Sequence, residues 1–254
     1  MIELQIEGAV ATITLNRPPA NAFSREGLHQ LRDTVRDLDA RPAVRALVIT
    51  GQGGKFFSAG ADLHTFADGD KGKAVDMIRA FGEAFETLSN SRLVTIAAIN
   101  GYAMGGGLEC ALSTDIRIAE EHAQLALPEA TVGLLPGGTG TQALPWLVGE
   151  GWAKRMILLG ERVDANTALR IGLVEEIVPS GQALAQATQM AQRVGNQSPD
   201  SVRACKQLIH AARNGIPRAA ALALEREHFI DLFNGPNQRE GVNAFLEKRK
   251  AVWQ

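Results

Sequence analysis

The sequence contains few cysteines. Only two occur among its 254 residues, Cys110 and Cys205, and they lie far apart in no metal-binding spacing. A disulfide framework and a cysteine-based zinc site are therefore excluded. Cys110 lies in an apolar segment, where a thiol packs as a small hydrophobic group. We expect both cysteines to be reduced thiols in a reducing compartment.

The sequence also lacks an excess of charge of one sign and any long apolar run. The net charge is −2 and no long basic run is present, which argues against a nucleic-acid partner. No uninterrupted apolar run approaches the roughly 20 residues that span a bilayer. The first residues, Met1 to Glu7, have neither the basic nor the apolar part of a signal peptide. We expect a cytoplasmic protein with neither a membrane nor a nucleic acid as partner.

Several common catalytic motifs are absent as well. There is no Walker A lysine motif and no His-Glu-x-x-His helix, and the histidines form no ligand spacing, so no metal site is predicted. The run Gly138 to Ala143 matches a relaxed dinucleotide-binding fingerprint, but Leu-Leu-Pro-Gly precedes it instead of a strand. Ser58 lacks the first glycine of a nucleophile elbow, because position 56 is phenylalanine. Nicotinamide binding and serine-based hydrolysis are therefore disfavoured.

Strand patterns alternate with helix patterns along most of the chain. Residues 2–15 predict a β-hairpin, and the apolar runs 44–50 and 93–99 predict buried strands. Ser24 is a suitable cap for a helix whose apolar stripe is Leu28, Leu31, Val35 and Leu38. A second apolar helix pattern runs from Val75 to Leu88, after an expected mobile loop at 68–73. This alternation predicts an α/β core.

The second half of the chain is predicted to be increasingly helical. We expect short strands at 116–119, 124–127 and 173–178, and helices at 141–148, 151–159 and 164–171. From about residue 182 onward the pattern contains only helices, with breaks near the prolines at 199, 217 and 236. Such a tail is typical of an appended bundle or an oligomerisation element.

The stretch from Asn100 to Glu109 combines a buried strand end, four glycines and one carboxylate. Consecutive glycines allow a positive φ or a very close approach of another group. If a helix starts there, its first N–H groups are free to bind an oxygen on which negative charge develops. The alternative is tight strand–helix packing, in which Glu109 only complements a helix N-terminus.

Two further features strengthen the catalytic interpretation. Ser58 to Asp62 is a turn of small residues that can present a backbone N–H to a ligand oxygen. Glu129 follows Pro128 directly, between an apolar strand and a glycine-rich loop. Burial favours the acid form of such a carboxyl group, as a proton donor requires. Either glutamate alone is more often structural, but the two beside glycine-rich turns predict one catalytic cleft.

At these residues the chain resembles the enoyl-CoA hydratase/isomerase (crotonase) family. The similarity covers nearly the whole chain, in the order of the family's motifs. The matching stretches are Asn16-Arg-Pro18, Phe57-Ser-Ala-Gly-Ala-Asp-Leu63, Ile99 to Leu112, Pro128-Glu129, Gly133-Leu-Leu-Pro-Gly-Gly-Thr-Gly-Thr-Gln142, Ala168 to Val174 and Arg239 to Lys250.

The resemblance implies an α/β spiral of ββα units in residues 1–195, which carries the active site. It also implies a helical trimerisation region in residues 196–254, with assembly as a homotrimer or as a homohexamer of paired trimers. In such proteins the thioester carbonyl of an acyl-CoA lies between two backbone N–H groups, which would belong here to Ala61 and Gly106. Glu109 would activate the water that attacks C3, and Glu129 would donate the proton to C2.

Because both glutamates are present, the resemblance implies hydration of a 2-trans-enoyl-CoA to the 3-hydroxyacyl-CoA. The alternatives are a double-bond isomerase in the same pocket and a non-catalytic or RNA-binding relative. Coenzyme A would enter as part of the substrate, so no separate cofactor is expected. His64 stands where many relatives carry a lysine. The resemblance implies substrate and CoA contacts at Ala22, Ala59, Gly60, Ala61, Asp62, Leu63, Gly105, Gly106, Phe245 and Lys248.

Overall fold

The computed structural model describes residues 1–254, and its chain forms two compact units. The first comprises residues 1–191 and the second residues 192–254. The division falls inside helix α6 (Ala183–Val194), a few residues before the boundary after residue 195 that the family resemblance implies.

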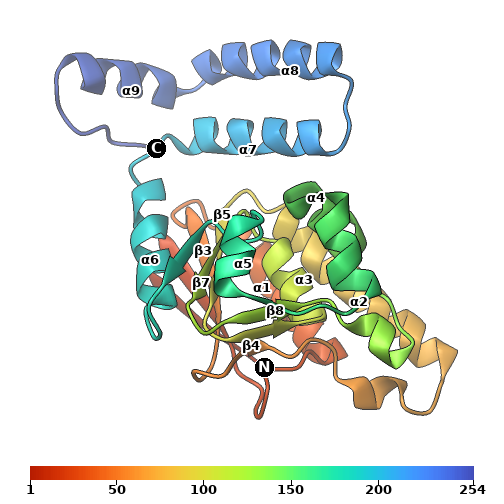
Figure 1. Ribbon diagram of the computed structural model, residues 1–254. Coiled ribbons are helices and arrows are strands. Elements are labelled where there is room, and N and C mark those ends of the chain that lie inside the picture. The colour runs from red at the N-terminus through yellow and green to blue at the C-terminus, as the bar shows by residue number, and fades with distance from the viewer. The chain divides into compact units, whose positions relative to one another are not determined.

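A six-stranded sheet forms the core of the first unit (Figure 1). Its strand order is β1-β2-β3-β5-β7-β10. The hairpin of β1 and β2 is antiparallel, as predicted, and all other neighbours are parallel. Every residue of β3 is buried, which explains its continuous apolar run. The strands are β1 (Ile2–Glu7), β2 (Val10–Leu15), β3 (Ala46–Gly51), β5 (Val94–Ile99), β7 (Ile116–Glu120) and β10 (Glu176–Val178).

A smaller sheet, in the order β4-β6-β8-β9, contains the remaining strands. It is built from β4 (Phe56–Ser58), β6 (Tyr102–Met104), β8 (Gln124–Ala126) and β9 (Val163–Asp164). Three successive chain segments each place one strand in the large sheet, the next in the small sheet, and then a helix. These helices are α2 (Lys71–Ser89), α3 (Gly106–Leu112) and α4 (Gly140–Leu158). The predicted spiral of ββα units is therefore confirmed.

Two amphipathic helices pack together beside the sheets. Helix α1 (Arg25–Asp39) begins after Ser24, whose hydroxyl accepts a hydrogen bond from the Gly27 N–H at 3.1 Å. Its predicted stripe of leucines and valine is buried, and the helix packs against α2. Asp70 caps α2 in the same way, through the N–H groups of Gly72 and Lys73. The predicted loop at 68–73 is therefore shorter, because this cap starts the helix at Lys71.

Several boundaries differ from the sequence predictions. The two helices expected at 141–148 and 151–159 are joined as α4, with a break at Gly149, where φ is 76°. The strand expected at 173–178 contains only residues 176–178, and α5 (Ala165–Arg170) lies near its predicted place. The strands β4, β6 and β9 have only two or three residues and were not predicted, because no alternating run extends beyond them as it does beyond the equally short β8.

The second unit is entirely helical, as predicted. After α6 it contains α7 (Pro199–Arg213), α8 (Arg218–Asp231), the short 3₁₀ turn η3 (Leu232–Asn234) and α9 (Pro236–Leu246). Helix α7 starts with Ser198 as its cap and a proline at its first turn. None of the helices of the chain combines the length and the apolar character needed to cross a bilayer.

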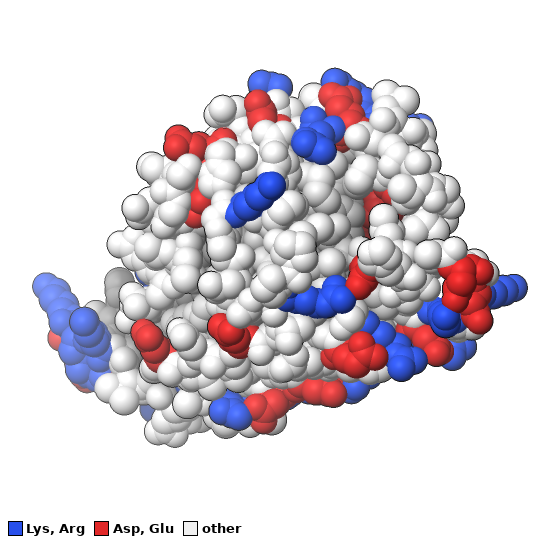
Figure 2. Space-filling view, turned by 90° about the horizontal axis from the view of Figure 1, so that it is seen from below, with Lys and Arg blue, Asp and Glu red and all other residues white.

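The surface charges are of mixed sign. On the face shown in Figure 2, lysine and arginine side chains alternate with acidic ones around a largely uncharged centre. No basic stripe runs across this face, which agrees with the net charge of −2.

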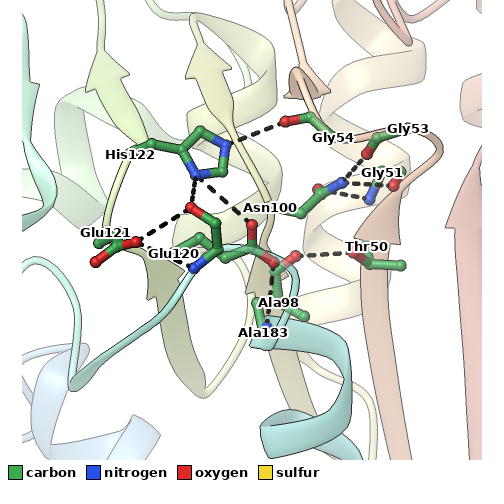
Figure 3. Close-up of polar contacts among 11 residues, drawn as sticks. Thr50, Gly51, Gly53, Gly54, Ala98, Asn100, Glu120, Glu121, His122 and Ala183 are labelled. Carbon is green, nitrogen blue, oxygen red and sulfur yellow. Dashed lines mark hydrogen bonds and ion pairs between the residues drawn. The ribbon is translucent and has the colours of Figure 1, made fainter.

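A buried asparagine joins two parallel strands just before the glycine-rich stretch (Figure 3). Asn100 follows β5, and its Oδ1 accepts a hydrogen bond from the Gly51 N–H at 3.1 Å. Its Nδ2 donates to the Gly51 carbonyl at 2.8 Å and to the Gly53 carbonyl. The ends of β3 and β5 are thereby held together at the edge where the following loops begin.

A second polar cluster in Figure 3 joins the start of α6 to the sheet. Oε1 of the buried Glu120 accepts a hydrogen bond from the Ala183 N–H at 3.2 Å. The ring of His122 contacts the Ser180 hydroxyl at 2.9 Å and the Gly54 carbonyl at 3.1 Å. Because these groups satisfy one another, we interpret the cluster as structural.

We expect Asn100→Ala to lower the free energy of unfolding by about 2–4 kcal/mol, because it leaves the buried backbone groups of Gly51 without partners. Urea denaturation of this variant and of Gln52→Ala, an exposed neighbour, provides the measurement and its control. A loss below about 0.5 kcal/mol for Asn100→Ala would show that the asparagine does not hold the two strands together.

Candidate active site

A largely apolar cavity of about 800 Å³ lies in the first unit. Its walls come from the 3₁₀ turn η1 (Leu63–Phe66), from α2, from the start of α3, and from η2 (Glu129–Val132) with the loop that follows it. Glu109 and Glu129 are the only carboxylic side chains that line it. The size and the lining are those of a small-molecule site.

The first free N–H group at the cavity belongs to Ala61. Phe23 forms a parallel β-bridge with Ala61. The Phe23 N–H donates to the Gly60 carbonyl at 2.7 Å, and the Phe23 carbonyl accepts a hydrogen bond from the Asp62 N–H at 3.0 Å. The Ala61 N–H itself donates to no acceptor of the chain. Gly60 has a φ of 88°, a conformation that favours glycine and turns the chain at this point.

The second free N–H group belongs to Gly106, the first residue of α3. At this position the helix offers no carbonyl partner, so the N–H points outward. The loop of Gly60 approaches closely, because a Cβ atom placed on Gly60 would lie 2.9 Å from the Gly106 nitrogen and 2.6 Å from the Met104 carbonyl oxygen. Ala61 and Gly106 both line the cavity, so their two N–H groups are brought to one place.

Glu109 is a buried carboxylate that holds the start of another helix. Only 3% of the residue is exposed. Its Oε1 accepts hydrogen bonds from the N–H groups of Gly138, Thr139 and Gly140 at 2.8, 2.9 and 2.8 Å. These groups begin α4, and three donors and a helix N-terminus stabilise negative charge there. Oε2 receives no hydrogen bond from the chain, and Glu109 lines the cavity.

Glu129 lies across the cavity in a very different environment. Its Oε2 is buried without any hydrogen-bond partner. Burial is the main cause that raises the pKa of Glu129 from its ordinary value of 4.5 to about 7, and the charge of Glu109 adds to it. Gly105, with a φ of 52°, makes room for this side chain, since a Cβ atom there would lie 2.9 Å from Oε1 of Glu129.

The two carboxyl groups therefore have different environments. Three backbone N–H groups bind one oxygen of Glu109, whereas burial raises the pKa of Glu129 to about 7. Both side chains face one cavity that the two residues with free N–H groups also line. This arrangement can bind an oxygen on which negative charge develops while it moves protons at neighbouring carbon atoms.

The structure brings most of the predicted binding residues of the first unit to the cavity. Ala59, Leu63 and Gly105 line it. Asp62 has other partners: it pairs with Arg17 at 2.7 Å and caps η1 through the His64 N–H. The hydrogen bond from Arg17 is the main cause that holds the pKa of Asp62 below its ordinary value.

Five of the predicted positions are not among the residues that line the cavity: Ala22, Gly60, Asp62, Phe245 and Lys248. The Ala22 carbonyl accepts a hydrogen bond from Arg17 at 3.1 Å, so the loop before α1 is tied to the Asp62 turn. Phe245 and Lys248 lie in the second unit, and both are exposed. His64 is exposed.

Sequence reasoning missed the side chains that form the apolar walls. Helix α2 contributes Val75, Ile78 and Phe81, and the loop after η2 contributes Leu134 and Leu135. The apolar positions of α2 were recognised, but a helical stripe does not distinguish a cavity wall from a core. The dinucleotide-like run at 138–143 also has a clear role, because its first N–H groups bind Glu109 instead of a phosphate.

A spiral of ββα units around a cavity lined by two glutamates defines the class of α/β protein to which this chain belongs. Consistent with this class, residues 5–254 match the family model of enoyl-CoA hydratase/isomerase. The chain belongs to this family.

Named relatives and solved structures resemble the chain over nearly its whole length. The short-chain-enoyl-CoA hydratase of Clostridium acetobutylicum is 37% identical over 254 residues, which cover 97% of this chain and 95% of the relative. The crotonyl-CoA hydratase of Syntrophomonas wolfei is 37% identical over 98% of this chain and 96% of its own. A structure of Pseudomonas aeruginosa DspI superposes with a TM-score of 0.97 at 60% identity, over 100% of this chain and 96% of that one.

The raised pKa of Glu129 predicts a pH-dependent effect of Glu129→Gln on stability. Between its ordinary pKa of 4.5 and about 7, the folded protein retains a proton that the unfolded chain releases, so burial of this carboxyl group destabilises the fold increasingly up to about pH 7. Glutamine does not ionise. We therefore expect the free energy of unfolding of the variant, relative to that of the wild type, to rise by roughly 1–3 kcal/mol as the pH goes from 5 to 8.5.

Urea denaturation at the two pH values measures this gain. Glu7→Gln, at an exposed position of β1, is the control and should show no such dependence. If Glu129→Gln changed the free energy of unfolding by the same amount at both pH values, the raised pKa would be contradicted.

Proposed function

We propose that the protein adds water to a 2-trans-enoyl-CoA and forms the 3-hydroxyacyl-CoA. The observation that carries this proposal is the pair of glutamates at one cavity, one held by three backbone N–H groups and the other with its pKa raised to about 7. Relatives that are 37% identical over nearly the whole chain carry the names of enoyl-CoA hydratases, which supports it further.

The two free N–H groups supply the electrostatic part of the mechanism. The thioester carbonyl oxygen binds between the N–H groups of Ala61 and Gly106. When water attacks C3, the electrons of the C2–C3 double bond move towards this oxygen and give it enolate character. One such donor typically contributes a factor of about 10²–10³ to the rate.

The two glutamates move the protons. Oε2 of Glu109 accepts a hydrogen bond from the water and orients its oxygen towards C3. As the C3–O bond forms, Glu129 gives its proton to C2 and regains one from the attacking water. The net change is the addition of one water molecule, and both glutamates return to their starting state. The three donors on Oε1 keep the Glu109 side chain fixed throughout.

Coenzyme A is part of the substrate in this proposal, and no separate cofactor takes part. Its adenine lies near the turn from Ala61 to Leu63, and its pantetheine lies along the loop from Asn16 to Ala22. Phe245 and Lys248, from the second unit of a neighbouring subunit, approach the nucleotide. A lysine provides a point charge for a phosphate group there.

A double-bond isomerase is the second candidate for the same cavity. One group with a pKa near neutrality, such as Glu129, suffices to move a proton from C2 to C4 and back. A 3-enoyl-CoA discriminates the two reactions, because an isomerase converts it to the 2-enoyl product without adding water. The ordered carboxylate of Glu109 favours hydration, which needs a group to hold the water.

The second unit serves as an oligomerisation element in this proposal, and the protein forms a homotrimer or a homohexamer. Its helices carry large apolar side chains that remain exposed in a single chain, and burial of such side chains between subunits is favourable. These side chains are Ile209, Phe229, Ile230, Phe233, Phe245 and Leu246.

The first test of the function follows the absorbance of the conjugated thioester after addition of crotonyl-CoA or a longer 2-trans-enoyl-CoA. We expect the wild type to consume it, and Glu109→Gln and Glu129→Gln each to lower kcat by about 10²–10⁴-fold, because each removes one proton-handling group. Glu7→Gln is the matched control.

Near-normal hydration by Glu129→Gln would refute the assigned mechanism. A wild type that hydrates none of these thioesters but isomerises a 3-enoyl-CoA would establish the second candidate instead.

Light scattering after size-exclusion chromatography tests the assembly. We expect a mass of three or six times the 27.2 kDa of one chain. Phe229→Glu with Phe233→Glu should lower this mass, because the two rings, 5.7 Å apart and exposed in one chain, would then introduce charge at the interface. A monomeric wild type would contradict the proposed role of the second unit.

A further inference from the structure

Three buried phenylalanine rings lie together behind the two free N–H groups. Phe81 and Phe85 are 5.4 Å apart between ring centroids, and Phe23 is 5.9 and 5.8 Å from them. All three pairs meet edge to face, with interplanar angles between 67° and 77°. Such pairs have a preferred geometry, and a close-packed core transmits a displacement of one ring to the next.

One member of this cluster fixes the first donor through its backbone. The N–H and the carbonyl of Phe23 bond to the residues on either side of Ala61. The direction of the Ala61 N–H therefore depends on where Phe23 lies, and the ring of Phe23 is held by the other two rings.

The second member contacts the second donor directly. A Cβ atom placed on Gly106 would lie 2.7 Å from Cε1 and 3.0 Å from Cζ of Phe81. The ring edge thus lies against the Gly106 backbone and sets how far the start of α3 can move towards α2. Phe81 is 4% exposed and lines the cavity, so its ring is held from the other sides by the core.

The third member contacts the loop that holds Glu109. A Cβ atom placed on Gly138 would lie 2.7 Å from Cδ2 of Phe85, and the Gly138 N–H donates to Glu109. Phe81 and Phe85 are four residues apart on α2, so they occupy one face of a rigid helix. Helix α2 thereby contacts both Gly106, which carries the second free N–H, and Gly138, whose N–H binds Glu109.

We infer that Phe81 is a positioning residue, which sets the place of the Gly106 N–H relative to the Ala61 N–H through the phenylalanine cluster. This inference rests on the proposed function, in which both groups bind the thioester oxygen. Phe81→Leu keeps the site apolar but removes the rigid ring edge, so α3 gains room to move. A displacement of about 1 Å at a reacting group can lower the rate about 10²-fold.

The test compares the wild type with Phe81→Leu by steady-state kinetics on an enoyl-CoA that the wild type hydrates. We expect kcat to fall about 10–100-fold while KM changes less than about threefold, because the donors stabilise the transition state more than the bound substrate. A spectroscopic measurement accompanies it. Dimethylaminocinnamoyl-CoA absorbs at longer wavelength when its carbonyl is polarised, and the variant should show a smaller shift on binding.

Leu88→Val is the matched control, since Leu88 is fully buried on the same helix but, unlike Phe81 and Phe85, is not among the side chains nearest to Gly106 or Gly138. It should keep both kcat and the absorbance shift, even if its thermal midpoint falls as much as that of Phe81→Leu. Phe81→Met, whose unbranched side chain adapts to an irregular gap, replaces the leucine variant if that one does not fold, with the same expected losses.

The outcomes separate the inference from the proposed function. An unchanged kcat and an unchanged absorbance shift in the Phe81 variants would overturn the inference, as would a rise in KM alone, which would make Phe81 only a wall of the cavity. A wild type that shifts the absorbance but hydrates no enoyl-CoA would refute the proposed function. In that case a smaller shift in Phe81→Leu would still support the positioning role.

Discussion

The site depends on one buried carboxylate at the start of a helix. Oε1 of Glu109 accepts three backbone hydrogen bonds from residues 138–140, where α4 begins. This single oxygen joins α3, which carries the glutamate, to α4. It accepts hydrogen bonds from N–H groups that have no partner within the helix, as is general at a helix N-terminus. The structural and the catalytic interpretations of Glu109 are therefore compatible, because they concern different oxygens of one carboxyl group.

The same residue type has opposite properties across the cavity. Glu129 has no partner for its buried Oε2, and its pKa is raised to about 7 chiefly by burial. An unpaired buried carboxyl group reduces stability and persists where function requires it. In the proposed mechanism, this contrast in environment gives the two glutamates different tasks. The sequence does not reveal this difference between the two glutamates, because it depends on which backbone N–H groups surround each side chain in the folded protein.

The architecture explains why these groups meet. Each ββα unit moves the chain from the large sheet to the small one and back into a helix, so the loops that follow β4 and β6 emerge side by side. Asn100 holds the strand ends before these loops, and the phenylalanine cluster supports them from behind. The free N–H groups are thus fixed by strands on one side and by α2 on the other.

The sequence by itself determined the local elements and the identity of the reactive groups. The Ser24 cap, the buried strands β3 and β5, the helical tail and the two glutamates beside glycine turns could all be predicted, because their signals lie within a few neighbouring residues. Only the tertiary structure decided which N–H groups hold Glu109, which side chains of α2 form the cavity wall, and where the short strands β4 and β6 pair. These features depend on contacts between segments tens of residues apart, such as Gly138 with Glu109, and no local pattern specifies such contacts.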